Sequence, residues 1–267
     1  MRPVSIPLFI KQHYQPGKVL EQNISALNIA IRSRYSDTPD ISVVIPAYNE
    51  ETTILQTLSS LAANTTKRTV EIVVVNNNSQ DRTAELATAA GARCILETKQ
   101  GITPARNAGL AAARGKYILN ADADTIYPPD WIEEMVKPLT AENEVAMVFG
   151  RFAFIPVGST TRRTYIWYEY FAELTRWINK TFREEAVNVY GFNSGFRKAD
   201  GMVVDGFTHP PGTNEDGWLA LKLRNNGFGK IHCVAQPNAM VWTTDRRIQI
   251  DGGLWKATVK RIKRMLS

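Results

Sequence analysis

The chain has few of the residues that build metal clusters and disulfide frameworks. Its 267 residues include two cysteines, Cys94 and Cys233, without CxxC spacing, and three histidines that are far apart in the sequence. Zinc sites and disulfide scaffolds are therefore not expected. With 44% hydrophobic and 22% charged residues, the composition is that of an ordinary globular protein. The length favours one domain with additions at its ends.

Long apolar runs are also missing. No run of about 18 apolar residues occurs, so the sequence predicts no membrane-spanning helix. Residues 1–10 contain one arginine and are interrupted by Pro3 and Pro7, which is atypical of a signal peptide, and we expect a cytoplasmic protein. The net charge of +6 is spread along the chain. It permits an anionic partner such as a nucleotide or a lipid head group, and it does not indicate nucleic acid.

Two common phosphate-binding signatures are absent. The sequence has no GxxxxGK[ST] motif and no GxGxxG after its first predicted strand. A bound nucleotide diphosphate would therefore need another source of positive charge. A divalent cation held by one or two carboxylates and by the phosphates themselves can supply it.

Short apolar runs alternate with helical patterns between residues 41 and 125. A helix after the first run is expected to have Asn49 as its cap, a second to run from Ser79 to Gly91, and a third to begin at Thr103 and close at Gly115. This alternation predicts an α/β fold with a mainly parallel sheet. The predicted strands are residues 41–46, 70–76, 92–97 and 116–120.

Two carboxylates, Asp122 and Asp124, follow the fourth predicted strand. Parallel sheets bind ligands at the carboxyl ends of their strands, and side chains at i and i+2 of an extended chain point the same way. The pair is therefore predicted to hold Mn²⁺ or Mg²⁺. Two alternatives stay open: ordinary turn chemistry, and a phosphatase of haloacid-dehalogenase type, whose Asp-x-Asp-x-Thr motif normally follows the first strand.

The alternation ends after Gly150. Residues 164–182 predict a helix with a broad apolar face, followed by a Gly/Asn-rich stretch at 190–196 and a loop at 207–218. Residues 251–267 are predicted to form a basic amphipathic segment. This segment could hold the chain on an anionic membrane surface, or it could pack on the domain. The apolar face of the first helix comprises Ile166, Trp167, Tyr170, Phe171, Leu174, Trp177, Ile178 and Phe182.

Five segments together resemble glycosyltransferase family 2. The resemblance covers roughly residues 41–250 and implies a GT-A fold with a nucleotide-binding half (41–125), an acceptor half (126–250) and an N-terminal extension (1–40). It also implies nucleotide-sugar donors, of UDP or GDP type, and inversion at the anomeric carbon. The segments are VVIPAYNEE (43–51), VVVNNNSQDRT (73–83), GITPARNAGL (101–110), LNADADT (119–125) and NEDGWLALKL (214–223).

The resemblance implies roles for individual residues. Asp122 would contact the ribose and share the metal, and Asp124 would bind the metal that bridges the diphosphate. Asn76 and Asn77 depart from the pair of aspartates common in the family. Lys99 and Arg106 are candidates for phosphate or pocket support, with a solvated or packing charge as the alternative. The nucleoside pocket would be lined by Pro46, Ala47, Tyr48 and Glu50.

The second half of the chain would supply the base. In the family, an acidic pair at the position of Glu215 and Asp216 includes an Asp that takes the acceptor proton, and Glu215 would support Asp216 in that role. The alternative is a helix N-terminus in which Thr213 and Asp216 form a capping box. Segment 190–196 is expected near the donor sugar or the acceptor, and Arg246 and Arg247 stand in a segment similar to one that can meet the diphosphate.

The sequence therefore predicts a metal-dependent inverting glycosyltransferase of the hexosyltransferase class, acting on a hydroxyl acceptor in polysaccharide or glycolipid synthesis. A lipid-linked acceptor would bring the enzyme to the cytoplasmic face of a membrane. The phosphatase and a membrane-surface binding protein without catalysis remain the alternatives.

Overall fold

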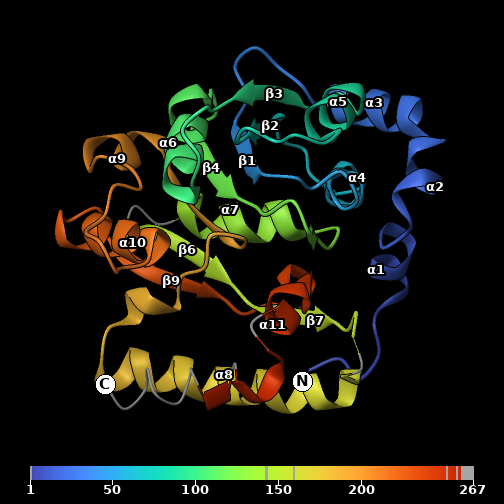
Figure 1. Ribbon diagram of the computed structural model, residues 1–267. Coiled ribbons are helices and arrows are strands. Elements are labelled where there is room, and N and C mark those ends of the chain that lie inside the picture. Colours follow the sequence, from blue (N-terminus) through green and yellow to red (C-terminus); the bar gives the residue numbers. More distant parts are fainter. Residues whose placement is uncertain (1, 142–143, 159, 251, 257, 260–267) are drawn as a thin grey trace.

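A seven-stranded, mostly parallel sheet forms the centre of the computed structural model, which describes residues 2–141, 144–158, 160–250, 252–256 and 258–259 (Figure 1). The strands β3, β2, β1 and β4 are parallel, β8 runs antiparallel to both β4 and β6, and β9 is parallel to β6. This arrangement confirms the predicted fold class. In spatial order the strands are β3 Arg93–Leu96, β2 Val70–Asn76, β1 Ile41–Ala47, β4 Tyr117–Asn120, β8 Ser194–Arg197, β6 Val145–Gly150 and β9 Lys230–Val234.

The core lies on both faces of this sheet. Alternate residues of β1 point to opposite faces, so Val43 and Ile45 join one apolar cluster while Val44 joins the other. The first cluster is covered by α4 Ile54–Ala62, α5 Thr83–Ala89 and α7 Trp131–Ala141. The second is covered by α6 Ile102–Ala112, α9 Lys198–Val203 and α10 Glu215–Asn225.

Two helices begin later than the sequence predicts. Asn49 has a positive φ of 53° and its side chain accepts a hydrogen bond from the backbone of Gln80, so it does not cap a helix. A turn follows, and α4 begins at Ile54. Ser79 lies in a second turn, held by the Asn76 side chain, and α5 begins four residues later. The two turns bond to each other: the backbone N–H of Asn49 donates to the Ser79 hydroxyl, and that of Gln80 donates to the Asn49 side chain. These N–H groups are therefore bonded between the turns and not within a helix.

The third predicted helix begins and ends earlier than the sequence predicts. Gly101, with a φ of 134°, precedes α6, so Thr103 lies inside the helix and does not cap it. Gly115 does not close the helix either, because α6 ends at Ala112. A Cβ on Gly115 would come within 2.5 Å of the backbone nitrogen of Ser42, so glycine is needed there for close approach to β1.

A smaller sheet joins distant parts of the chain. Its strands are β5 Thr125–Ile126, β10 Val241–Thr244 and β7 Phe152–Ile155. β10 runs antiparallel to β5 and parallel to β7. The short helices η1 Glu185–Asn188, η2 Pro237–Ala239 and α11 Arg246–Ile250 lie in the same half of the chain. The pairing of β5 with β10 therefore brings the C-terminal residues next to the acidic pair that follows β4.

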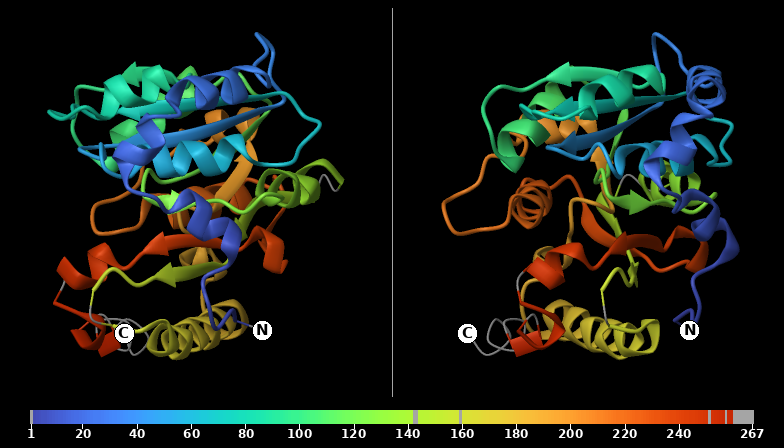
Figure 2. Two further views of the ribbon diagram at one scale, coloured as in Figure 1. Left: turned by 90° about the vertical axis from the view of Figure 1, so that its right-hand side faces the viewer. Right: turned by 45° about the vertical axis from the view of Figure 1, so that its right-hand side comes forward.

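The N-terminal residues form a side layer rather than a separate tail. Helices α1 Leu8–His13, α2 Gly17–Glu21 and α3 Ile24–Arg32 pack on α4 and run along one side of the molecule (Figures 1 and 2). Arg2 is buried, and its guanidinium donates to the carbonyl oxygen of Phe152. Residues 1–40 thus touch both halves of the predicted catalytic domain.

Helix α8, Arg162–Phe182, is held by a buried ionic network in addition to the packing of Tyr165 on Phe154. Glu169 is fully buried and accepts hydrogen bonds from the backbone of Phe154 at 2.8 Å and from Arg162 at 2.9 Å. Glu173 pairs with Arg2, Arg176 and Arg151. The helix is present as predicted, but its buried face is the polar one.

Replacing Glu169 with glutamine should leave buried arginine charge uncompensated. We expect the free energy of unfolding in urea to fall by about 3–5 kcal/mol, as is usual when one partner of a buried ion pair is removed. Glu133→Gln is the matched control, because Glu133 pairs with Arg68 at the surface and such pairs contribute about 0–1 kcal/mol. Equal losses in the two variants would contradict the importance of the buried network.

Candidate active site

The acidic pair lies on the short connection from β4 to β5. The backbone of Ala121 donates to Val44 of β1, which fixes the connection at the carboxyl edge of the sheet. Ala121 and Ala123 are buried, whereas the side chains of Asp122 and Asp124 are 20% and 10% exposed. Both carboxylates therefore project to the same, more open side of the connection. Each of them pairs with a different arginine.

Arg106 of α6 joins Asp122 to Asp216. Its Nη2 lies 3.0 Å from Asp122 Oδ1 and its Nε lies 3.7 Å from Asp216 Oδ1, with only 2% of the side chain exposed. Burial alone would lower the pKa of Arg106, but the two carboxylates outweigh it and raise this pKa above its ordinary value. Arg106 is thus not a solvated charge. It connects the first half of the chain to the second.

Asp216 is the buried carboxyl group of this site. It stands in the first turn of α10 and is 4% exposed. Burial raises its pKa to about 7; the positive charge of Arg106 opposes this rise, and Glu215 and Asp122 add to it. A carboxyl group that titrates near neutral pH can accept a proton from a substrate hydroxyl.

The alternative role of Asp216 in a capping box is wrong. The side chain of Asn214, not that of Thr213, caps α10 by accepting a hydrogen bond from the backbone of Gly217 at 2.7 Å. The Asp216 side chain therefore does not cap the helix. Glu215 stands beside it, partly exposed, at the first position of the helix.

Segment 190–196 lies against Arg106 and Asp216. A Cβ on Gly191 would overlap both the Arg106 guanidinium and the Asp216 carboxylate, so only glycine allows the backbone to lie this close. The hydroxyl of Tyr127 donates to the carbonyl of Phe192 and accepts from the backbone of Asp122, both at 2.9 Å. This tyrosine therefore ties the segment to the acidic pair.

Arg246 supplies the positive charge beside Asp124. It follows β10, whose antiparallel pairing with β5 places Thr243 opposite Thr125, so the chain after β10 passes the residue before β5. The Arg246 guanidinium lies 3.2 Å from Asp124 and also pairs with Glu50. The side chain of Arg247 lies outside the described residues.

The residues predicted to line the nucleoside pocket lie at the carboxyl end of β1. Pro46 and Ala47 end that strand, and Tyr48 follows with half of its side chain exposed. Glu50 accepts a hydrogen bond from the hydroxyl of Thr53 at 2.6 Å in addition to its pairing with Arg246. Arg246 thus links Glu50, which follows β1, to Asp124, which follows β4.

The side chains of Asn76 and Asn77 already hold local structure. Asn76 accepts a bond from the backbone of Ser79, and the buried Asn77 amide bonds Glu97, Lys99 and Gly101. Asn77 therefore braces the loop before α6. The Lys99 side chain is exposed. Their contact with a nucleotide stays a prediction.

The site can accept a divalent cation through two carboxylates. No group of three or more His, Cys, Asp or Glu side chains with metal-ligand geometry occurs among the residues that the structure describes. Asp122 and Asp124 nevertheless offer hard oxygen ligands on one side of the connection, and Mg²⁺ and Mn²⁺ commonly combine one or two carboxylates with substrate phosphates and water. The residues therefore fit a cation that arrives together with a diphosphate.

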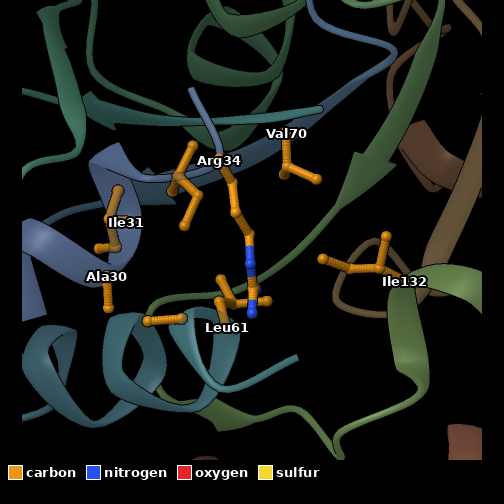
Figure 3. Close-up of a pocket in the computed structure, with 8 residues that line it drawn as sticks. Ala30, Ile31, Arg34, Leu61, Val70 and Ile132 are labelled. Atoms are coloured by element: carbon orange, nitrogen blue, oxygen red, sulfur yellow. The ribbon is translucent and has the colours of Figure 1, made fainter. Parts of the chain in front are cut away.

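A small apolar pocket elsewhere does not compete for this role. It lies between α3, α4 and the amino end of β2, and the Arg34 side chain extends into it (Figure 3). Its space fits little more than one water molecule. Parallel sheets bind ligands at the opposite, carboxyl edge, so we assign this pocket to packing.

Comparison with known proteins decides the family. A model described as glycosyl transferase family 2 matches residues 42–203. The chain belongs to glycosyltransferase family 2. The probable glycosyltransferase YdaM of Bacillus subtilis is 28% identical over 226 residues, which are 79% of this chain and 52% of that protein, so this family 2 chain spans about half the length of that relative.

Two solved structures share the fold of this chain. S. aureus TarS in complex with UDP has a TM-score of 0.59 and 18% identity, and covers 77% of this chain and 60% of its own. The glucosyl-3-phosphoglycerate synthase of Mycobacterium tuberculosis, with Mn²⁺, UDP-glucose and phosphoglyceric acid, has a TM-score of 0.50 and 22% identity. It covers 79% of this chain and 74% of its own. A haloacid-dehalogenase phosphatase is not favoured, because the acidic pair follows the fourth strand of a glycosyltransferase fold.

The raised pKa of Asp216 predicts how stability depends on pH. The folded protein retains a proton between the ordinary pKa of 3.8 and about 7, so this residue's contribution to stability is lost as the pH rises through about 7. Asp216→Asn cannot ionise. We therefore expect its melting temperature relative to the wild type to be higher at pH 8.5 than at pH 5. Asp37→Asn, at an exposed position, should show no such change, and an equal difference at both pH values would contradict the assignment.

Proposed function

We propose that this family 2 enzyme is a metal-dependent inverting glycosyltransferase that uses a UDP-sugar and a hydroxyl acceptor. The observation that carries the proposal is the Arg106 bridge, which joins a donor-side carboxylate, Asp122, to a buried carboxyl group, Asp216. A donor held at one end of this bridge would have its anomeric carbon near the other. In this proposal Asp122 contacts the donor and Asp216 acts as the base.

The proposed chemistry needs one base and no protein nucleophile. The acceptor hydroxyl oxygen attacks the anomeric carbon while its proton passes to a carboxylate oxygen of Asp216. The bond from that carbon to the diphosphate oxygen breaks, and the nucleoside diphosphate leaves with the electron pair. A bound Mn²⁺ or Mg²⁺ supplies charge stabilisation to the leaving diphosphate. Glu215 keeps the pKa of Asp216 high and so supports its basicity.

Donor binding is proposed at the carboxyl ends of β1 and β4. Pro46, Ala47 and Tyr48 would meet the nucleoside, Glu50 and Asp122 the ribose, and Asp124 the metal. Two structural neighbours crystallised with UDP or UDP-glucose, one of them with Mn²⁺, support this donor class. Arg246 now pairs with Asp124, so it would turn from the carboxylate to the diphosphate when donor and metal bind.

We also propose that the acceptor belongs to polysaccharide or glycolipid synthesis, and that a lipid-linked acceptor is used at the cytoplasmic face of a membrane. The proposal is supported by the basic residues that end the chain, including Lys260, Arg261, Lys263 and Arg264, which suit an anionic leaflet. The helical face expected from Trp255 onward is described only in part, because Ile262 and Leu266 lie outside the described residues.

The metal role of Asp124 is tested by ligand-induced stabilisation. UDP with Mn²⁺ at 100 times the dissociation constant should stabilise the protein by about 2.7 kcal/mol. Asp124→Asn should remove the part of this stabilisation that depends on Mn²⁺, and sugar transfer should be lost. Asp37→Asn should retain both. Full transfer activity in excess EDTA would rule out the metal-dependent mechanism.

The base role of Asp216 is tested by the pH dependence of turnover. Because the carboxylate must be unprotonated to accept a proton, kcat/KM of the wild type should rise with pH and level off above about 7. Asp216→Asn should retain UDP binding and lower kcat by roughly 10²–10⁴. Glu215→Gln should leave turnover largely intact and move the rise to lower pH, since it removes a neighbouring negative charge. An unchanged kcat in Asp216→Asn would leave the base unassigned.

A further inference from the structure

The apolar face of α8 points away from the protein. Trp167, Tyr170, Leu174, Trp177 and Phe182 are between 45% and 77% exposed. An apolar helix face of this width normally packs on a core. Here the buried positions of the helix are instead Tyr165, Glu169, Ala172, Thr175 and Arg176.

The ion pairs beneath α8 fix this orientation. Turning the helix to bury its aromatic residues would expose Glu169 and Glu173 and strand the arginines that pair with them. Removing one partner from a buried ion pair is strongly destabilising. The apolar stripe is therefore a fixed feature of the folded protein, and a contiguous exposed stripe of this kind marks an interaction surface.

The stripe lies on the outer edge of the molecule. Helix α8 forms the lower edge in Figures 1 and 2, on the far side from β3 and α5. Its 21 residues span about 31 Å. No helix in the described part of the chain combines the length and the apolar character needed to cross a bilayer, so this helix could lie on a membrane but not pass through it.

Most of the exposed charges beside the stripe are basic, although Glu185 pairs with Lys180 at 3.5 Å. Arg163 is exposed near its start, and Lys180 and Arg183 are exposed at its end. Of the two acids in α8, Glu169 is buried and Glu173 is largely covered. The segment of residues 252–256 lies beside α8 in Figure 1 and in the right view of Figure 2. Trp255 and Lys256 in this segment are exposed.

We propose that this surface, defined as the outward face of α8 with Trp255 and Lys256, docks the enzyme on an anionic lipid bilayer. Trp and Tyr side chains favour the boundary between lipid head groups and acyl chains, and basic residues flanking an apolar stripe are typical of helices that lie in that boundary. A second copy of the chain fits less well. Two α8 faces in contact would bring mainly basic side chains together, including Arg163 of each copy, which is unfavourable.

The test measures membrane binding without donor, metal or activity, so it can fail or succeed independently of the proposed function. The full chain is sedimented with vesicles of phosphatidylglycerol and phosphatidylcholine, and with vesicles of phosphatidylcholine alone, at low salt. We expect binding to the anionic vesicles, and weaker binding to the neutral ones because basic residues are attracted to an anionic surface.

The decisive variant is Trp167→Gln with Trp177→Gln. Both side chains are exposed, so the fold should be kept, and loss of two apolar anchors should reduce partitioning about tenfold or more. The matched control is Ile29→Gln with Val203→Gln, two exposed apolar residues on α3 and at the end of α9, and this variant should bind as the wild type does. Quenching of tryptophan fluorescence by brominated lipids should also fall in the decisive variant.

Three results would overturn the proposal. The wild type could fail to sediment with anionic vesicles at low salt. The Trp167/Trp177 variant could sediment as well as the wild type, which would assign any binding to other basic residues. Finally, sedimentation velocity could show a wild-type dimer that this variant converts to a monomer, with vesicle binding unchanged, and the stripe would then be an interface between copies.

Discussion

The proposed active site depends on one buried arginine between two carboxylates. Arg106 is almost fully covered and cannot lose its charge, so at least one carboxylate must stay beside it to offset the cost of burial. Asp122 comes from the connection after β4 and Asp216 from the first turn of α10. The guanidinium therefore fixes the distance between the two halves of the site, and Gly191 permits the covering backbone to follow its shape.

The same charge sets the chemistry of Asp216. A carboxyl group buried without a partner would be protonated over most of the physiological range, and one in a tight ion pair would be a weak base. Asp216 has a cation at 3.7 Å, while Asp122 and Glu215 act against that cation. The balance leaves its pKa near neutrality. Catalytic groups commonly owe such values to a combination of burial and neighbouring charges.

Much of the fold follows from local patterns, whereas the site needed tertiary contacts. The β-branched runs at 41–46 and 70–76 predicted two strands of the sheet, and the acids after the run at 116–120 predicted its functional edge. The helix starts predicted at Asn49 and Ser79 are wrong because the two turns bond to each other.

The bridge by Arg106 could not be predicted, since 110 residues separate it from Asp216. The sequence predicts a capping box with Thr213, whereas Asn214, which directly precedes Glu215 and Asp216, caps the helix. Helix α8 was predicted in place, but no periodicity could reveal that a buried ionic network would turn its apolar side outward.

The contact between Arg246 and Asp124 also has a consequence for how the protein folds. These residues are 122 positions apart in the chain, and they meet only when the very short strands β5 and β10 pair. Contacts between distant residues must first offset the entropy of closing the intervening loop, and chains tend to form them late. The sheet of β1 to β4 can assemble from neighbouring segments. We therefore expect Asp122 and Asp124 to reach their positions before Arg246 pairs with Asp124. The donor half would then exist for a time as a folded structure whose Asp124 still lacks the C-terminal guanidinium.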